Sequence, residues 1–308
     1  MDVLKKLVDG ERALRAWLWA SLICNMGIIV TGAVVRLTGS GLGCSEWPKC
    51  TPETWTTTRA AGIHGAIEFG NRMLTFVLVA VAIGAFIAAW RNRGLRSKLW
   101  WITLGVGLGI PFQGVIGGFT VWSDLNPFVV ALHLLLSVAL IIVCVWALKV
   151  GYGVTASPLA PGARWLVIAT FAVVMVAIWL GTVTTGTGPH AGDAQAPRTG
   201  FDIVVVSRIH ALSAWASVAL TIACVWLFSK TRQARAAGAS RLLLITLVLQ
   251  GVIGYIQYFF GLPVVVVALH MVGLTLLTAA AAWLLVSTTR RTDAHQSAAD
   301  DRAAVHAS

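Results

Sequence analysis

Long apolar runs separated by short polar segments make up most of the chain. The runs predict helices at 17–36, 63–89, 99–119, 128–148, 165–186, 204–228, 242–260 and 262–286. Each run approaches or exceeds the roughly 20 residues that an α-helix needs to cross the hydrocarbon core of a bilayer. The pattern therefore predicts an all-α integral membrane protein with eight transmembrane helices.

The composition agrees with this class and excludes another. Of the 308 residues, 57% are hydrophobic and only 11% are charged, whereas a soluble domain has about 25% charged residues. Lys and Arg outnumber Asp and Glu by 23 to 12, a net charge of +11. Nucleic-acid binding would require these cations to cluster on one solvated face, but they are spread between the apolar runs. We therefore expect the protein to lie in the lipid bilayer and to bind no nucleic acid.

The basic residues also orient the chain. With the N-terminus in the cytoplasm, the inner segments hold 17 of the 23 basic residues. The six basic residues on the outer side are matched by six acids. The positive-inside rule then places both termini in the cytoplasm.

A sequence repeat divides the chain into two halves. Residues 113–133 and 250–270 share 11 identities in 21 positions at a constant offset of 137, and a weaker similarity joins 31–43 to 180–192. We expect two tandem four-helix bundles related by a pseudo-two-fold axis along the membrane normal, because each half has an even number of spans. The predicted divisions are 1–149 for the first half, 150–163 for a cytoplasmic linker, 164–289 for the second half and 290–308 for a disordered tail.

Three histidines lie at one depth in this scheme. His133, His210 and His270 each follow the outer start of a helix by about six or seven residues, or roughly 10 Å at 1.5 Å per residue. Two facing imidazoles on neighbouring helices are what axial ligation of a heme requires. The alternative is a hydrogen bond across a helix interface. Because the same VALH sequence ends both repeats, we favour ligation for His133 and His270, with His210 as the partner of His270.

A second polar cluster lies near the outer end of the second predicted helix. Spacings of i, i+4 and i+7 place His64, Glu68 and Asn71 on one helix face. A carboxylate within the bilayer is a candidate for catalysis. The alternative is an i, i+4 ion pair between Glu68 and Arg72 that only satisfies the charge.

The remaining candidates lie on the outer side of the membrane. Arg36, Arg72 and Arg208 have guanidinium groups that match the carboxylates of heme propionates; the alternative is that they reach up to water. Cys44 and Cys50 flank the segment CSEWPKC on the oxidising side, so we expect a disulfide. Two free thiols or a metal pair are the alternatives.

Taken together, these motifs resemble the heme A synthase family. The resemblance rests on TGAVVRLTGSGLGCSEWPKC, on Glu68-x-x-Asn71-Arg72, on the repeated ALH and on the duplicated eight-span layout, and it covers nearly the whole chain. It implies a bacterial cell-membrane oxidoreductase that converts a ring methyl of heme O to the formyl group of heme A for a terminal cytochrome oxidase. It also implies an electron donor, and contacts with a heme O synthase and with cytochrome oxidase assembly proteins.

The resemblance further implies a role for each half. The second half would hold the cofactor heme b between His210 and His270. The first half would hold the substrate heme O, with His133 as iron ligand and Glu68 as the catalytic carboxylate. Many family members have histidine where this chain has Asn71, and an amide is a poor iron ligand. We therefore expect His133 to be the sole ligand, with Asn71 at the other face and His64 as the hydrogen-bond or proton partner of Glu68.

Two other function classes use similar features. A di-heme b-type cytochrome that exchanges electrons with quinone would have the same histidine pairs, but it would not need a carboxylate beside one heme. A transporter would also contain repeats, but its site usually lies near the bilayer centre between broken helices.

Overall fold

The computed structural model describes residues 8–156 and 159–288. Within those ranges it contains eight long helices and a short 3-10 turn, η1 (Arg59–Ala61), and no strand. The helices are α2 (Gly10–Leu37), α3 (Gly62–Arg91), α4 (Leu99–Trp122), α5 (Pro127–Gly151), α6 (Pro161–Thr187), α7 (Ile203–Lys230), α8 (Ala234–Phe259) and α9 (Val264–Thr288). All eight are long and apolar enough to cross a membrane. The predicted fold class is confirmed.

Two helices begin well before the apolar runs that predicted them. Helix α2 begins at Gly10, and its first turns carry an i, i+4 ion pair between Arg15 and Glu11 at 2.7 Å. Helix α8 begins at Ala234, and its first two turns bury small side chains, among them Ala236 and Ala239. Both extensions are polar or alanine-rich, so a criterion based on apolar runs alone misses them.

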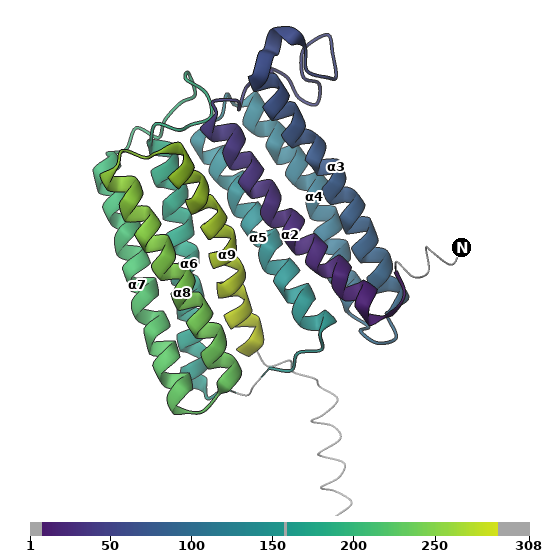
Figure 1. Ribbon diagram of the computed structural model, residues 1–308, viewed down its shortest axis with the longest axis vertical. Coiled ribbons are helices and arrows are strands. Elements are labelled where there is room, and N and C mark those ends of the chain that lie inside the picture. The colour runs from purple at the N-terminus through teal and green to yellow at the C-terminus, as the bar shows by residue number, and fades with distance from the viewer. Residues whose placement is uncertain (1–7, 157–158, 289–308) are drawn as a thin grey trace, which may run out of the picture.

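The helices form two four-helix groups that lie side by side, α2 to α5 and α6 to α9 (Figure 1). In the first group each helix contacts its two neighbours around a ring, and α3 and α5 are diagonal, with no contact between them among the described residues. The second group repeats this pattern, with α7 and α9 diagonal.

The two groups meet through four helices. Helix α5 contacts α9, α2 contacts α9, and α5 contacts α6. Exchanging each helix for its counterpart in the other group reproduces these same pairings, as a two-fold relation requires. The axis itself and the domain divisions remain predictions. The predicted disordered tail, 290–308, lies outside the described residues.

Packing differs along the length of the helices. In α5 no residue between Pro127 and Val138 is buried, the first buried residue of α7 is Ser217, and that of α9 is Leu274. In these three helices the buried residues therefore resume four to seven residues below His133, His210 and His270.

Candidate functional site

Three histidines lie at matched depths near the outer starts of α5, α7 and α9. His133 is six residues after Pro127, the first residue of α5, and His270 is six residues after Val264, the first of α9. His210 is seven residues into α7. His210 and His270 therefore lie at the same depth on the two diagonal helices α7 and α9 of the second group.

Each of these imidazoles faces a glycine on a neighbouring helix. A Cβ placed on Gly117 of α4 would lie 3.4 Å from Cε1 of His133, and one on Gly181 of α6 would lie 3.2 Å from Cε1 of His210. The corresponding distance from Gly254 of α8 to His270 is 3.8 Å. The absence of a side chain at these positions gives the rings room to present their nitrogen atoms to a planar group.

The nitrogens of His210 are set for metal binding. Its Nδ1 lies 3.0 Å from the carbonyl oxygen of Ala177. A carbonyl only accepts hydrogen bonds, so Nδ1 carries the hydrogen and Nε2 has a free lone pair. This is the usual orientation of a ligating histidine, whose second nitrogen donates to a main-chain or carboxylate oxygen. Nδ1 of His133 and of His270 is buried and has no hydrogen-bond partner among the described residues.

The repeat in the sequence is also a repeat in hydrogen bonding. Gln113 Nε2 donates to the carbonyl oxygen of His133 at 3.1 Å, and Gln250 Nε2 donates to that of His270 at 3.0 Å. The two sets are separated by the same 137 residues as the sequence repeat. The residues around the histidines of both groups therefore fit the same kind of ligand, a heme.

Among the described residues, only the first group has a buried carboxylate. Glu68 of α3 is 6% exposed. Its Oε1 accepts from Arg72 Nε at 3.1 Å and from Nη2 at 2.5 Å, and its Oε2 accepts from the main-chain N–H of Cys44 at 2.7 Å. The Glu68–Arg72 ion pair, which the sequence offered as an alternative to a catalytic role, is thus present. It does not account for the bond to Cys44, which ties the carboxylate to the outer loop.

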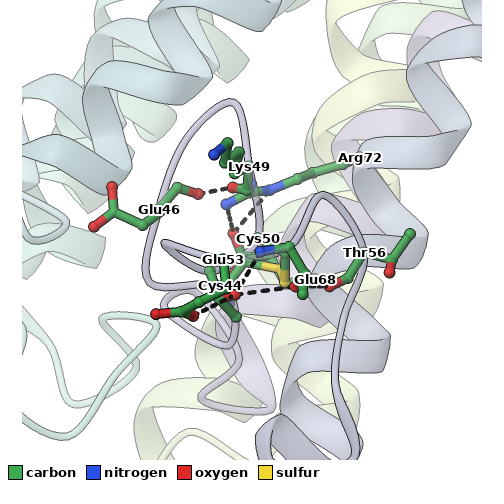
Figure 2. The surroundings of a disulfide bond; sticks show 10 residues. Cys44, Glu46, Lys49, Cys50, Glu53, Thr56, Glu68 and Arg72 are labelled. Atoms are coloured by element: carbon green, nitrogen blue, oxygen red, sulfur yellow. Dashed lines mark hydrogen bonds and ion pairs between the residues drawn. A yellow bond between two sulfur atoms is a disulfide. The ribbon is translucent and has the colours of Figure 1, made fainter.

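Arg72 extends this attachment to the rest of the loop. Its Nη1 donates to the carbonyl oxygens of Glu46 and Lys49 at 2.8 and 2.9 Å (Figure 2). In the same loop, Trp47 lies over Gly118 of α4 and makes an edge contact with Trp122 at 5.3 Å between ring centroids. The loop therefore covers the outer end of the first group from α3 to α4.

The Cys44–Cys50 disulfide is present, as predicted. Both cysteines are fully buried beneath the loop, next to the Glu68 and Arg72 contacts (Figure 2). The three other cysteines, Cys24, Cys144 and Cys224, are free. The disulfide and the ion pair hold the loop at its base.

A comparison with known protein families bears directly on this arrangement. The COX15-CtaA family, described as cytochrome oxidase assembly protein, matches residues 15–281, a span that contains every candidate site residue. The chain belongs to this family. The family resemblance inferred from the motifs is therefore confirmed.

Three relatives of this chain share one name. Heme A synthase of Rhizorhabdus wittichii is 25% identical over an alignment 326 positions long, which covers 88% of this chain and 92% of that protein. Heme A synthase of Listeria monocytogenes serotype 4a is 24% identical over 298 residues, covering 91% and 97%. Heme A synthase of Methylorubrum extorquens strain PA1 is 29% identical over 213 residues, but that match covers 58% of this chain and 55% of that protein.

The direct hydrogen bond predicted between His64 and Glu68 is not present among the described residues, and the role of His64 as a proton partner stays a prediction. His64 does not bond to Glu68 among the described contacts: its Nδ1 lies 2.9 Å from Ser40 Oγ, and the side chain is exposed near the start of α3. The carboxylate oxygens of Glu68 are occupied by Arg72 and Cys44 instead. Asn71 lies deeper in α3, and its Oδ1 is buried without a partner in the described structure.

The three candidate arginines have different surroundings. Arg36 joins the two halves, because its Nε donates to the carbonyl oxygen of His190 and its Nη2 to that of Thr185 at 2.7 Å. Arg72 holds the disulfide loop, as described above. Arg208 is exposed near the outer start of α7. Propionate binding by these residues remains a prediction, and for Arg36 the inter-half contacts are an additional role that its position in the sequence did not indicate.

Sequence reasoning missed two kinds of residue at the site. The glutamines Gln113 and Gln250 and the glycines Gly117 and Gly254 all belong to the repeated QGVIG segment. Their identity in both halves was the available signal.

The disulfide has a direct chemical test. In denatured, non-reduced protein we expect three of the five cysteines to react with a maleimide probe, and all five after reduction, since only Cys24, Cys144 and Cys224 are free. Labelling of all five before reduction would contradict the assignment. Replacing Cys44 and Cys50 together with serine should destabilise the loop by about 2 kcal/mol, because the unfolded loop gains conformational freedom.

Proposed function

We propose that the protein is a heme A synthase, which oxidises a ring methyl group of heme O to the formyl group of heme A. Membership in the COX15-CtaA family and the names of its relatives support this proposal. The observation that carries it is an asymmetry between two otherwise similar groups. Both contain a histidine held by a glutamine, but within the described ranges only the first has a buried carboxylate, Glu68, on the helix diagonal to that histidine.

The first group would hold the substrate. His133 would bind the iron of heme O, while Glu68 lies on the diagonal helix α3, under the outer loop. Oxidation of a methyl group passes through an alcohol to an aldehyde hydrate, which loses water to give the formyl group. Each oxidation step replaces a C–H bond by a C–O bond. With water as the oxygen source the substrate releases two electrons and two protons, and with O2 as the source two electrons and two protons must be supplied to reduce the second oxygen atom to water. A fixed carboxylate in a site covered by a loop can stabilise developing positive charge or accept a proton.

The second group would hold heme b. His210 and His270 would hold its iron, and a heme held by two histidines would supply electron transfer. The free Nε2 of His210 and the facing glycines Gly181 and Gly254 support this assignment. When bound, heme b would pass electrons between the substrate site and an electron donor or acceptor.

The cellular location and the partners follow from the same proposal. The excess of basic residues on one side supports a cell-membrane location with cytoplasmic termini. Heme O is itself a hydrophobic product of membrane chemistry, so a heme O synthase is the expected supplier. Cytochrome oxidase assembly proteins are the expected recipients of heme A.

The ligands of the substrate heme can be distinguished by mutation. We expect His133→Ala to abolish heme O binding and His64→Ala to retain it. His64 lies near the end of α3 and contacts Ser40, whereas Asn71 lies deeper and has a free buried oxygen. Heme O retained by each purified variant is measured by pigment extraction. Equal loss in both variants would mean that both histidines bind the iron.

The function is tested by heme production in cells. A bacterial host that makes heme O but no heme A should form heme A when it expresses this chain, as detected by mass spectrometry of extracted hemes. A di-heme cytochrome would leave the heme O pool unchanged. The absence of heme A from cells that accumulate the folded protein with bound heme O would contradict the proposal.

A further inference from the structure

The two glutamines of the repeat share one unusual feature. Each uses its amide nitrogen to hold the main chain of a histidine-bearing turn, at 3.1 Å for Gln113 and 3.0 Å for Gln250. The other amide atom, Oε1, is buried in both copies and has no hydrogen-bond partner among the described residues. Gln250 is only 8% exposed. Buried polar atoms of native proteins nearly always have a partner. An unpaired acceptor at the equivalent position of both groups therefore indicates that a donor binds there.

The neighbouring histidines lack the complementary partner. Nδ1 of His133 and Nδ1 of His270 are also buried and unpaired in the described structure. A histidine that binds a metal through Nε2 carries its hydrogen on Nδ1, which is then a donor. Each group therefore contains one open donor and one open acceptor, on residues of adjacent helices that already share a hydrogen bond.

The third histidine shows how such a donor is satisfied. His210 Nδ1 lies 3.0 Å from the carbonyl oxygen of Ala177, and the glycine that faces the ring, Gly181, comes four residues later on α6. The same spacing separates glutamine from the facing glycine in 113–117 and in 250–254. Each neighbouring helix thus offers an oxygen acceptor at one position and a glycine one turn later. On α6 the acceptor is a main-chain carbonyl, and on α4 and α8 it is the glutamine.

We propose that Gln113 and Gln250 are positioning residues for His133 and His270. Their amide nitrogens fix the main chain of the histidine turn, and their Oε1 atoms accept the Nδ1 hydrogen, directly or through one water molecule, when Nε2 binds iron. This inference rests on the proposed heme ligation. An acceptor on Nδ1 orients the ring and makes Nε2 more basic. A more basic ligand favours ferric over ferrous iron, so Gln250 lowers the reduction potential of heme b.

The test compares two substitutions of Gln250 in the purified full-length protein. Gln250→Met keeps the length of the side chain but removes both the hydrogen bond to the His270 carbonyl oxygen and the proposed acceptor, whereas Gln250→Glu retains an oxygen acceptor. Potentiometric titration followed by visible absorbance should show a higher heme b potential in the Met variant, with a several-fold larger ratio of reduced to oxidised heme at a fixed potential. The Glu variant should titrate at or below the wild-type potential.

Gln257 supplies a matched control. It lies on the same helix and donates from Nε2 to the carbonyl oxygen of Val266 on α9 at 3.1 Å, so Gln257→Met removes an equivalent bond between α8 and α9 that does not involve His270, one turn later. Its heme b potential should match that of the wild type. Loss of heme b from Gln250→Met alone, with retention in Gln250→Glu and Gln257→Met, would also support the proposal.

Two results would overturn the positioning role while leaving the function intact. One is the same heme b potential in Gln250→Met and Gln257→Met, which would mean that Gln250 only connects two helices. The other is a Gln250→Glu variant that behaves like Gln250→Met. Absence of heme b from the wild-type protein would instead contradict the proposed function, so the two failures are distinguishable.

Discussion

Glu68→Ala should lower heme A formation by at least about 100-fold, the usual loss on removal of a group that takes part in proton transfer, while heme b stays bound. The side chain is buried in the first group, and its partners are Arg72 and the N–H of Cys44. The proposed heme b ligands belong to the other group. The measurement is the ratio of heme A to heme O in extracts of cells that express equal amounts of each variant.

Two substitutions separate charge from attachment of the loop. Glu68→Gln keeps an acceptor for the Cys44 N–H but loses the charge, whereas Glu68→Asp keeps the charge on a shorter side chain. We expect partial activity only in the Asp variant. Glu53→Gln is the matched control, because Glu53 is an exposed acid of the same outer loop that bonds to Thr51, and it should retain full activity. A wild-type heme A yield in Glu68→Gln would show that the charge is not needed.

Replacing His210 or His270 with alanine should remove most heme b and leave any remainder high-spin. Each substitution deletes one of the two nitrogens that would complete a six-coordinate iron. Visible and electron paramagnetic resonance spectra of the purified variants measure this directly. His64→Ala, a change of the same residue type in the other group, should retain the low-spin signal. A low-spin spectrum that is unchanged in both His210→Ala and His270→Ala would exclude this pair as the ligands.

The helices and the depth of the histidines were predictable from the sequence because both depend on the bilayer. A span must be apolar over about 20 residues, and an ionisable residue within it stands out. The early starts of α2 and α8 were not predictable in this way, since Arg15, Glu11 and Ala236 are stabilised by an ion pair or by packing and not by contact with lipid.

The contacts of the candidate site were less predictable than its residues. Glu68, Arg72 and the disulfide were all found in the sequence, but the partners that join them are main-chain atoms of Cys44, Glu46 and Lys49. Which main-chain atoms face a side chain depends on the path of a loop, and residue types do not specify that path. Arg36 was missed as a link between the halves for the same reason, because its partners are carbonyl oxygens about 150 residues away.

The heme content of the purified wild-type protein tests the central claim most directly. If one group holds a permanent heme b and the other holds the substrate, protein from cells that make heme O should contain heme b together with heme O or heme A. Mass spectrometry of the acid-extracted pigment, with the visible spectrum of the same sample, gives the answer in one preparation. Heme b as the only pigment in protein from such cells would contradict the account and favour an electron-transfer cytochrome.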